Sequence, residues 1–276
     1  MGRDAVSCPP GLKPGYINGG SRRTLQEIQR ILTGGRRDAE ARRWLKANDD
    51  VRKNMAADVN CLVSATHFLP IFLLSNDENF LVDSSVSTVY LSHRNRDPLK
   101  AAEFLSRALH RIIFQGMSLE EALDSAAETT NDHFITSKLQ NAKDKVKEAL
   151  DTSSQLSKEE FMDDIAITSM SRLWEIGKSE PIKIGKASPT EGALPASLYI
   201  ALKYKDDLPK ALQVNANIGG DSAARGIVIG MLLGAVHGQD AIPKKWIETL
   251  NSYEDVNRVF NKIRQNANEE EVCVNK

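Results

Sequence analysis

The sequence has 276 residues, of which 41% are hydrophobic and 26% are charged, a composition typical of a globular protein with a substantial core. Basic side chains number 36 and acidic ones 37, so no whole-protein charge favours nucleic acid or an anionic membrane as a partner. The three scattered cysteines, Cys8, Cys61 and Cys273, fit neither a disulfide framework nor a CxxC metal site, which predicts a reducing, cytoplasmic setting.

Apolar residues recur at helical spacing along nearly the whole chain, whereas strand-like alternation is hard to find. The sequence therefore predicts an all-α fold, in one compact multi-helix domain. Residues 1–20 are expected to form an extended lead-in, 21–265 the domain, and 266–276 a frayed tail.

The first expected helix starts after Ser21 and ends at Gly34-Gly35, and a basic helix follows to about Trp44. Residues 56–74 are apolar on most faces and predict a core helix that is kinked or ended near Pro70. The S-x-x-E capping box at Ser118 starts another helix. The remaining expected helices lie near 78–91, 98–115, 136–151, 195–204 and 208–215, after Asp221, around Trp246, and near 253–265.

The longest loop-like segment lies at about 178–195. Its sequence, starting at Gly177, is GKSEPIKIGKASPTEGALP. Long loops in compact domains are often functional, so this segment is a candidate part of a site.

The helix after Asp221 carries an apolar run at 227–236, which is too short for a membrane span of about 20 residues. Its glycines recur at every fourth position, at 226, 230, 234 and 238. This spacing predicts a bare stripe against which a neighbouring helix packs backbone to backbone, in a helix buried on most sides.

A single carboxylate, Asp221, follows two glycines at the start of that helix. Its side chain can cap the free amides of the helix, or it can point into a cleft and bind a hard cation. Arg225, one helical turn later, forms either an ion pair with Asp221 or a cation placed to meet substrate phosphates. Both pairs of interpretations stay open on the residues alone.

The other polar candidates are expected to be structural or solvent-exposed rather than functional. His67 and His237 have no metal-ligand spacing and are expected to be structural. The arginine pairs at 22–23, 36–37 and 42–43 are expected to line solvated helix faces, with an acidic partner or a pyrophosphate as the alternative. No GxxxxGK[ST], GxGxxG or GxSxG element points to a nucleotide triphosphatase, a Rossmann enzyme or an α/β-hydrolase.

The stretch IGGDSAARGIVIGMLLGAVHG, followed by DAIPKKW, closely resembles the C-terminal motif of the ADP-ribosylglycohydrolase family, in its J1-crystallin-like branch. ALPASLYIALKYKDDLPKALQVNANIGGD resembles the family's approach to that motif. LSHRNRDPLKAAEFLSRALHRIIFQGMSLEEAL resembles the segment that commonly reads T-H-x-D-P before a helix. The resemblance runs from about Asp58 to Leu250.

The family implies a compact all-α domain that binds paired magnesium ions and cleaves the N- or O-glycosidic bond joining ADP-ribose to an acceptor. Carboxylates in such a site orient a water for attack at the anomeric carbon, and pyrophosphate rests on helix N-termini. The implied partner is ADP-ribose or an ADP-ribosylated substrate.

The chain departs from the family pattern at its metal motifs. A fully equipped member reads Gly-Gly-Asp-Thr-Asp-Thr where this chain has Ala223 and Ala224, which cannot coordinate a metal. Asp58 is the one carboxylate left in the nearest equivalent of the earlier motif. Magnesium is therefore expected to be weak, single or absent, because two carboxylates cannot neutralise two divalent ions.

The expected function is hydrolysis of an ADP-ribose glycosidic bond. The alternatives are a non-catalytic protein that binds ADP-ribose or a nucleotide, and a crystallin-like structural protein. The resemblance implies that Asp221 and Asp58 are the catalytic and metal-binding carboxylates, with substrate bound by Gly219, Gly220, Ser222, Arg225 and Asn60.

Overall fold

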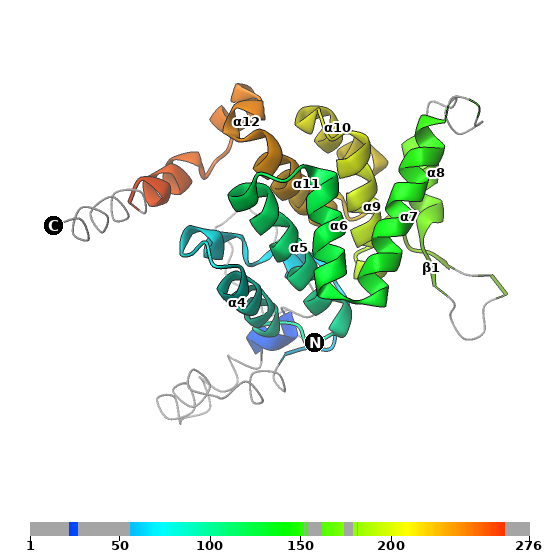
Figure 1. Cartoon of the computed structure of the whole chain (residues 1–276), viewed down its shortest axis with the longest axis horizontal. Helices are drawn as coiled ribbons and strands as arrows, with labels where there is room; N and C mark the ends of the chain where they lie inside the picture. The colour runs from blue at the N-terminus through cyan, green and yellow to red at the C-terminus, as the bar shows by residue number, and fades with distance from the viewer. Residues whose placement is uncertain are drawn as a thin grey trace, which may run out of the picture.

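The computed structural model describes residues 22–26, 56–151, 153, 162–173, 179–180 and 182–262. These residues are predominantly helical (Figure 1). The strands found among them, β1 (Arg172–Leu173) and β2 (Ile182–Lys183), form a two-residue antiparallel pair. The prediction of an all-α fold is confirmed.

Helices make up most of the described residues. In chain order they are η1 (Leu62–Thr66), η2 (Leu69–Leu73), α4 (Glu78–Tyr90), α5 (Arg96–Gln115), α6 (Leu119–Thr130), α7 (His133–Leu150), α8 (Met162–Met170), α9 (Thr190–Lys203), α10 (Leu208–Ile218), α11 (Ser222–His237), η4 (Gln239–Ala241) and α12 (Lys244–Glu248). Residues 253–262 are also helical and extend away from the rest of the fold (Figure 1).

Two helices, α5 and α9, form the centre of the packing. α5 contacts α4, α6, α7, α9, α11 and η1, and α9 contacts α7, α8, α10 and α11 as well. In α9 every residue except Glu191 and Lys203 is buried. The apolar side chains of these helices and their neighbours form a core that runs from Leu62 to Leu233.

Polar caps set the starts of several helices where the sequence places them. The Ser118 hydroxyl accepts from the amide of Glu121, whose side chain accepts from the Ser118 amide, so the predicted capping box is present at α6. The side chains of Asp77, Asn95 and Asp132 each accept from a backbone amide in the first turn of α4, α5 and α7 respectively. The helices expected near 78–91, 98–115 and 136–151 are confirmed.

The prediction of one core helix over residues 56–74 is wrong. The segment forms the short 3₁₀ helices η1 and η2 instead, and no residue of η2 is buried. Pro70 lacks an amide donor, and its ring blocks an α-helix from continuing past it. The hydroxyls of Ser64 and Thr66 also favour the tighter 3₁₀ geometry, because each donates to the carbonyl three residues earlier.

Helix α9 begins at Thr190, five residues before the expected start at 195, so its first turn lies before Pro195. A proline inside a helix leaves the carbonyl four residues earlier without its usual donor. Here that carbonyl belongs to Glu191, and it accepts from the Ser171 hydroxyl at 2.7 Å. Ser171 follows α8, a helix that the sequence analysis did not predict, although two aspartates precede its apolar residues.

The prediction of a close-packed glycine stripe on α11 is also wrong. A Cβ atom built at Gly230 or Gly234 would have no neighbour within 4 Å, and at Gly226 it would meet only Asn215, at 3.3 Å. Gly238 lies past the helix and ends it with a φ of 73°. The buried face of α11 is made by larger residues, namely Ala224, Arg225, Val228, Ile229, Met231, Leu232 and Leu233.

We expect Gly234→Ala to raise the free energy of unfolding by about 0.5 to 1 kcal/mol, because alanine restricts the unfolded chain and meets no neighbour in α11. Urea denaturation measures the change. Gly226→Ala is the matched control and should gain less, since its Cβ would crowd Asn215. A loss of stability in Gly234→Ala would show that another segment packs against the stripe.

Several expectations lie outside the described residues. These are the lead-in at 1–20, the basic helix to Trp44, the tail at 266–276, and the first helix beyond 22–26. In the part of the chain that the structure describes, no helix is long and apolar enough to cross a membrane.

Candidate functional site

Two segments distant in sequence meet at one loop, residues 184–190, which we call the linking loop. The Leu62 amide donates to the Ser188 carbonyl at 3.0 Å, and the Asp221 amide donates to the Lys186 carbonyl at 2.8 Å. The linking loop thereby joins the segment before η1 to the turn before α11. The predicted loop-like stretch 178–195 contains this junction.

Asp221 lies at the N-terminus of α11, where its Oδ1 accepts from the Ala224 amide at 3.4 Å. Its side chain is half-buried, so it caps the helix and also reaches the surface. The preceding Gly219 and Gly220 have φ values of 73° and 69°, which favour glycine. A Cβ at Gly220 would lie 2.4 Å from the Lys186 carbonyl oxygen, so the two glycines are needed to bring Asp221 against the linking loop.

Arg225 is completely buried beneath this turn. Its Nε donates to Asn215 Oδ1 at 2.9 Å, and its two terminal nitrogens donate to the carbonyls of Lys186 at 3.2 Å and Gly219 at 2.5 Å. Burial lowers the pKa of the guanidinium, and the nearby Asp221 charge opposes that shift. Arg225 therefore holds the turn in place, and its direct contact with a substrate stays a prediction.

Asn215 completes this support from α10. Its Nδ2 donates to the Ser222 carbonyl at 2.7 Å while its Oδ1 accepts from Arg225. The oxygen and the nitrogen of the buried side-chain amide thus both fix the first turn of α11.

Asp58 and Asn60 lie on the other side of the linking loop. Asp58 is exposed, and its Oδ1 accepts from Asn95 Nδ2 at 3.0 Å. Asn60 accepts from the Thr190 amide at 2.9 Å and donates to Asp97 Oδ2 at 2.9 Å. Its amide therefore ties the N-terminus of α9 to the N-terminus of α5.

Cys61 lies between these two sides of the site. Burial raises the pKa of its thiol, and the charge of Asp221 acts in the same direction, while a hydrogen bond with Ser188 opposes it. The thiol therefore stays protonated at neutral pH. It contributes to packing and sits close enough to Asp221 to sense its charge.

Two histidines, His67 and His93, have lowered pKa values and carry no charge at neutral pH. His93 is buried, and burial together with the nearby His67 lowers its pKa to about 4. His67 also has a lowered pKa because of burial. The Nε2 of His237 lies 2.5 Å from the Lys205 carbonyl oxygen, at the far end of α11.

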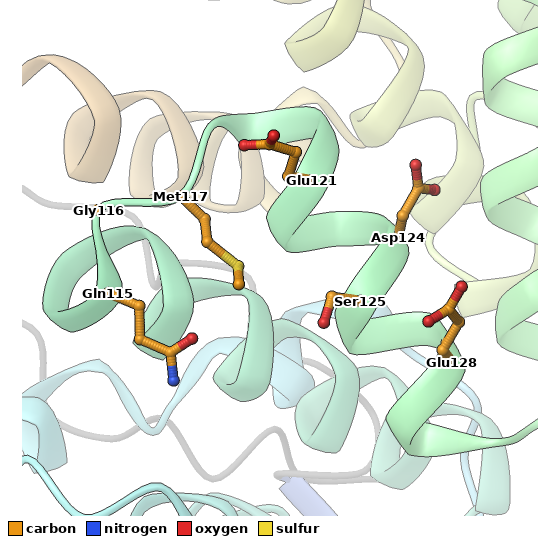
Figure 2. Close-up of a pocket in the computed structure, with 7 residues that line it drawn as sticks. All are labelled: Gln115, Gly116, Met117, Glu121, Asp124, Ser125 and Glu128. Atoms are coloured by element: carbon orange, nitrogen blue, oxygen red, sulfur yellow. The ribbon is translucent and has the colours of Figure 1, made fainter.

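An open cavity of about 530 Å³ lies elsewhere, between the end of α5 and α6. Figure 2 shows its carboxylates spread along α6, with the Met117 side chain pointing toward that helix. It is lined by Gln115, Gly116, Met117, Glu121, Asp124, Ser125 and Glu128. Three carboxylates would repel a pyrophosphate, so this cavity is a poor place for a nucleotide sugar.

The model of the family described as ADP-ribosylglycohydrolase matches residues 7–272, which is nearly the whole chain. The chain belongs to the ADP-ribosylglycohydrolase family. The family predicted from the glycine-aspartate motif is confirmed. A search of curated proteins finds no match.

The carboxylates at this site do not fit a paired magnesium centre. Asp58 and Asp221 each use one oxygen in a hydrogen bond, and Ala223 and Ala224, which follow Ser222 in α11, have no donor atom for a metal. Among the described residues, no three histidine, cysteine, aspartate or glutamate side chains gather closely enough to hold a metal ion. That magnesium is weak, single or absent stays a prediction.

Sequence reasoning missed several of the residues that build the site. Asn95, Asp97 and Thr190 bond to Asp58 and Asn60, and Lys186 bonds to Asp221. Asn95 and Asp97 lie in the stretch that resembles T-H-x-D-P, so that motif was the available signal. Lys186 carried none, because its backbone carbonyl makes the contact.

Proposed function

We propose that the chain hydrolyses the glycosidic bond that joins ADP-ribose to an acceptor, at the junction around the linking loop. Membership of the ADP-ribosylglycohydrolase family supports this reaction class. The observation that carries the location is the convergence of the Asp58 and Asp221 segments on one loop.

In this proposal Asp221 and Asp58 lie beside the anomeric carbon of the ribose, which is the carbon bonded to the acceptor. Hydrolysis of a glycosidic bond passes through an oxocarbenium-like state, which nearby carboxylates stabilise. One carboxylate also orients the attacking water and accepts one of its protons, and the departing acceptor nitrogen or oxygen takes up a proton from solvent as its bond to the carbon breaks. Asp221 is half-buried, so solvent screens its charge less than that of the exposed Asp58, and we assign to Asp221 the larger part of both roles.

The pyrophosphate of the substrate would lie at the N-terminus of α11, beside Gly220 and Ser222. Free backbone amides and the helix dipole favour an anion there. Helix α9 offers a second N-terminus nearby, and Pro189 at its start provides no side-chain cap.

We also assign the chain to the J1-crystallin-like branch, on the form GGDSAAR at residues 219–225. A cytoplasmic location is inferred from the scattered cysteines. The alternatives are that this chain binds ADP-ribose or a nucleotide without cleaving it, or that it is a crystallin-like structural protein.

We expect calorimetry to detect ADP-ribose binding, and Asp221→Ala to weaken it at least about tenfold. The titration is run with magnesium and with a chelator, because the donor set predicts little dependence on the metal. Asp124→Ala, in the acidic cavity, is the matched control and should bind like wild type. No binding by wild type under either condition would reject an ADP-ribose site.

A further inference from the structure

The linking loop lies directly against the backbone of α8. A Cβ at Gly185 would lie 1.7 Å from the carbonyl oxygen of Ile167, so the loop can approach α8 this closely only with glycine there. The Ile184 amide also donates to the carbonyl of Ser171, just past α8, at 2.9 Å. The position of α8 therefore determines the position of the loop.

The start of α8 is itself anchored on α9. The Asp163 carboxylate accepts from Tyr199 Oη at 2.6 Å, Lys203 Nζ at 2.6 Å and Tyr204 Oη at 2.5 Å. Burial alone would raise the pKa of Asp163, but the hydrogen bonds from Lys203 and the two tyrosines outweigh it and lower the pKa. Asp163 is therefore ionised at neutral pH and fixes the first turn of α8.

Lys186 connects this anchored helix to the candidate site. Its ammonium pairs with Asp164, the residue next to Asp163. Its carbonyl accepts from the Asp221 amide at 2.8 Å and from Arg225 at 3.2 Å. One residue thus contacts α8 through its side chain and the turn before α11 through its backbone.

We propose that Lys186 is a positioning residue for Asp221: the ion pair with Asp164 holds the Lys186 carbonyl where it orients the Asp221 turn. Its effect on ligand binding rests on the proposed function of Asp221, but its effect on the turn does not. The pair lies about one-third exposed, with side-chain exposures of 34% for Lys186 and 40% for Asp164.

The expected effect is correspondingly small and local. Exposed ion pairs shift an equilibrium by about 1.5- to 5-fold, and the anchored Asp163 reduces the side-chain and backbone freedom that usually weakens such pairs. Losing the pair should therefore loosen the Asp221 turn by that factor without unfolding the protein.

Hydrogen exchange at the Asp221 amide tests the proposal without any ligand. Lys186→Met and Asp164→Asn should each speed exchange about 1.5- to 5-fold. The double variant should show no further increase, because both changes remove the same pair. Lys186→Arg should restore slow exchange. Lys143→Met, which breaks an ion pair with Asp124 on α6, is the matched control and should leave this amide unchanged.

Calorimetry with ADP-ribose then tests the link to the site, where Lys186→Met should raise Kd by about the same factor as it speeds exchange. Unchanged exchange, or a rise of equal size in the Lys143→Met control or throughout the protein, would overturn the proposal. Faster exchange with an unchanged Kd would also overturn it. If wild type fails to bind ADP-ribose, the proposed function fails, while the exchange result still decides the positioning role.

Discussion

Replacing Arg225 with methionine is expected to lower the free energy of unfolding by about 3 to 5 kcal/mol. The guanidinium is fully buried and donates to three acceptors, two of them backbone carbonyls. Methionine fills a similar volume but has no donor, so Asn215 Oδ1 and the Gly219 carbonyl would lose the donor that Arg225 provides, and the Lys186 carbonyl would keep only the Asp221 amide. Buried acceptors without a donor account for the size of the loss.

Urea denaturation of wild type and Arg225→Met measures this loss. Arg258→Met is the matched control, since the Arg258 side chain is 68% exposed and pairs only with a residue on its own helix, and it should change stability by less than about 0.5 kcal/mol. If Arg225→Met stays within about 1 kcal/mol of wild type, the three hydrogen bonds do not hold the turn before α11.

Asp221→Asn is expected to slow release of ADP-ribose by about a hundred- to ten-thousand-fold, because asparagine cannot accept the proton of the attacking water. Stability should change little, since asparagine caps a helix as well as aspartate does. The variant therefore separates the chemical role of Asp221 from its structural one. An equally slow Asp124→Asn variant would show that the loss does not come from the site.

Local signals in the sequence were enough for much of the fold. The capping box at Ser118 and the amphipathic spacing of residues 98–115 each concern neighbours within one helix, so they predict an element without knowledge of its surroundings. The Gly-Gly-Asp order likewise predicts a turn and a cap before α11, and both are present.

Patterns that depend on the surroundings were misread. The glycines at 226, 230 and 234 have a spacing that suits close helix packing. The larger residues of α11 form its buried face instead, and in the described part of the chain no atom lies within 4 Å of a Cβ built at Gly230 or Gly234. Residues 56–74 are apolar enough for a core helix, yet Pro70 and the hydroxyls before it favour 3₁₀ turns. Composition alone does not say which face another helix will cover.

Only part of the candidate site could be predicted from the sequence, because the rest depends on contacts between distant segments. Asp221 and Asp58 stand in motifs and could be named, whereas the loop that joins their segments contributes backbone carbonyls. Every residue has a carbonyl, so nothing distinguishes Lys186 or Ser188 in the sequence. Arg225 could be singled out by position, but its three acceptors come from segments as far away as residue 186.

Release of ADP-ribose from an ADP-ribosylated protein by the wild-type chain tests the central claim most directly. The account predicts that wild type releases free ADP-ribose with one water consumed per bond, in chelator as well as in magnesium, and that Asp221→Asn does so far more slowly. A wild-type chain that binds ADP-ribose yet releases none from arginine- or serine-linked substrate, in either condition, would contradict hydrolysis at this site.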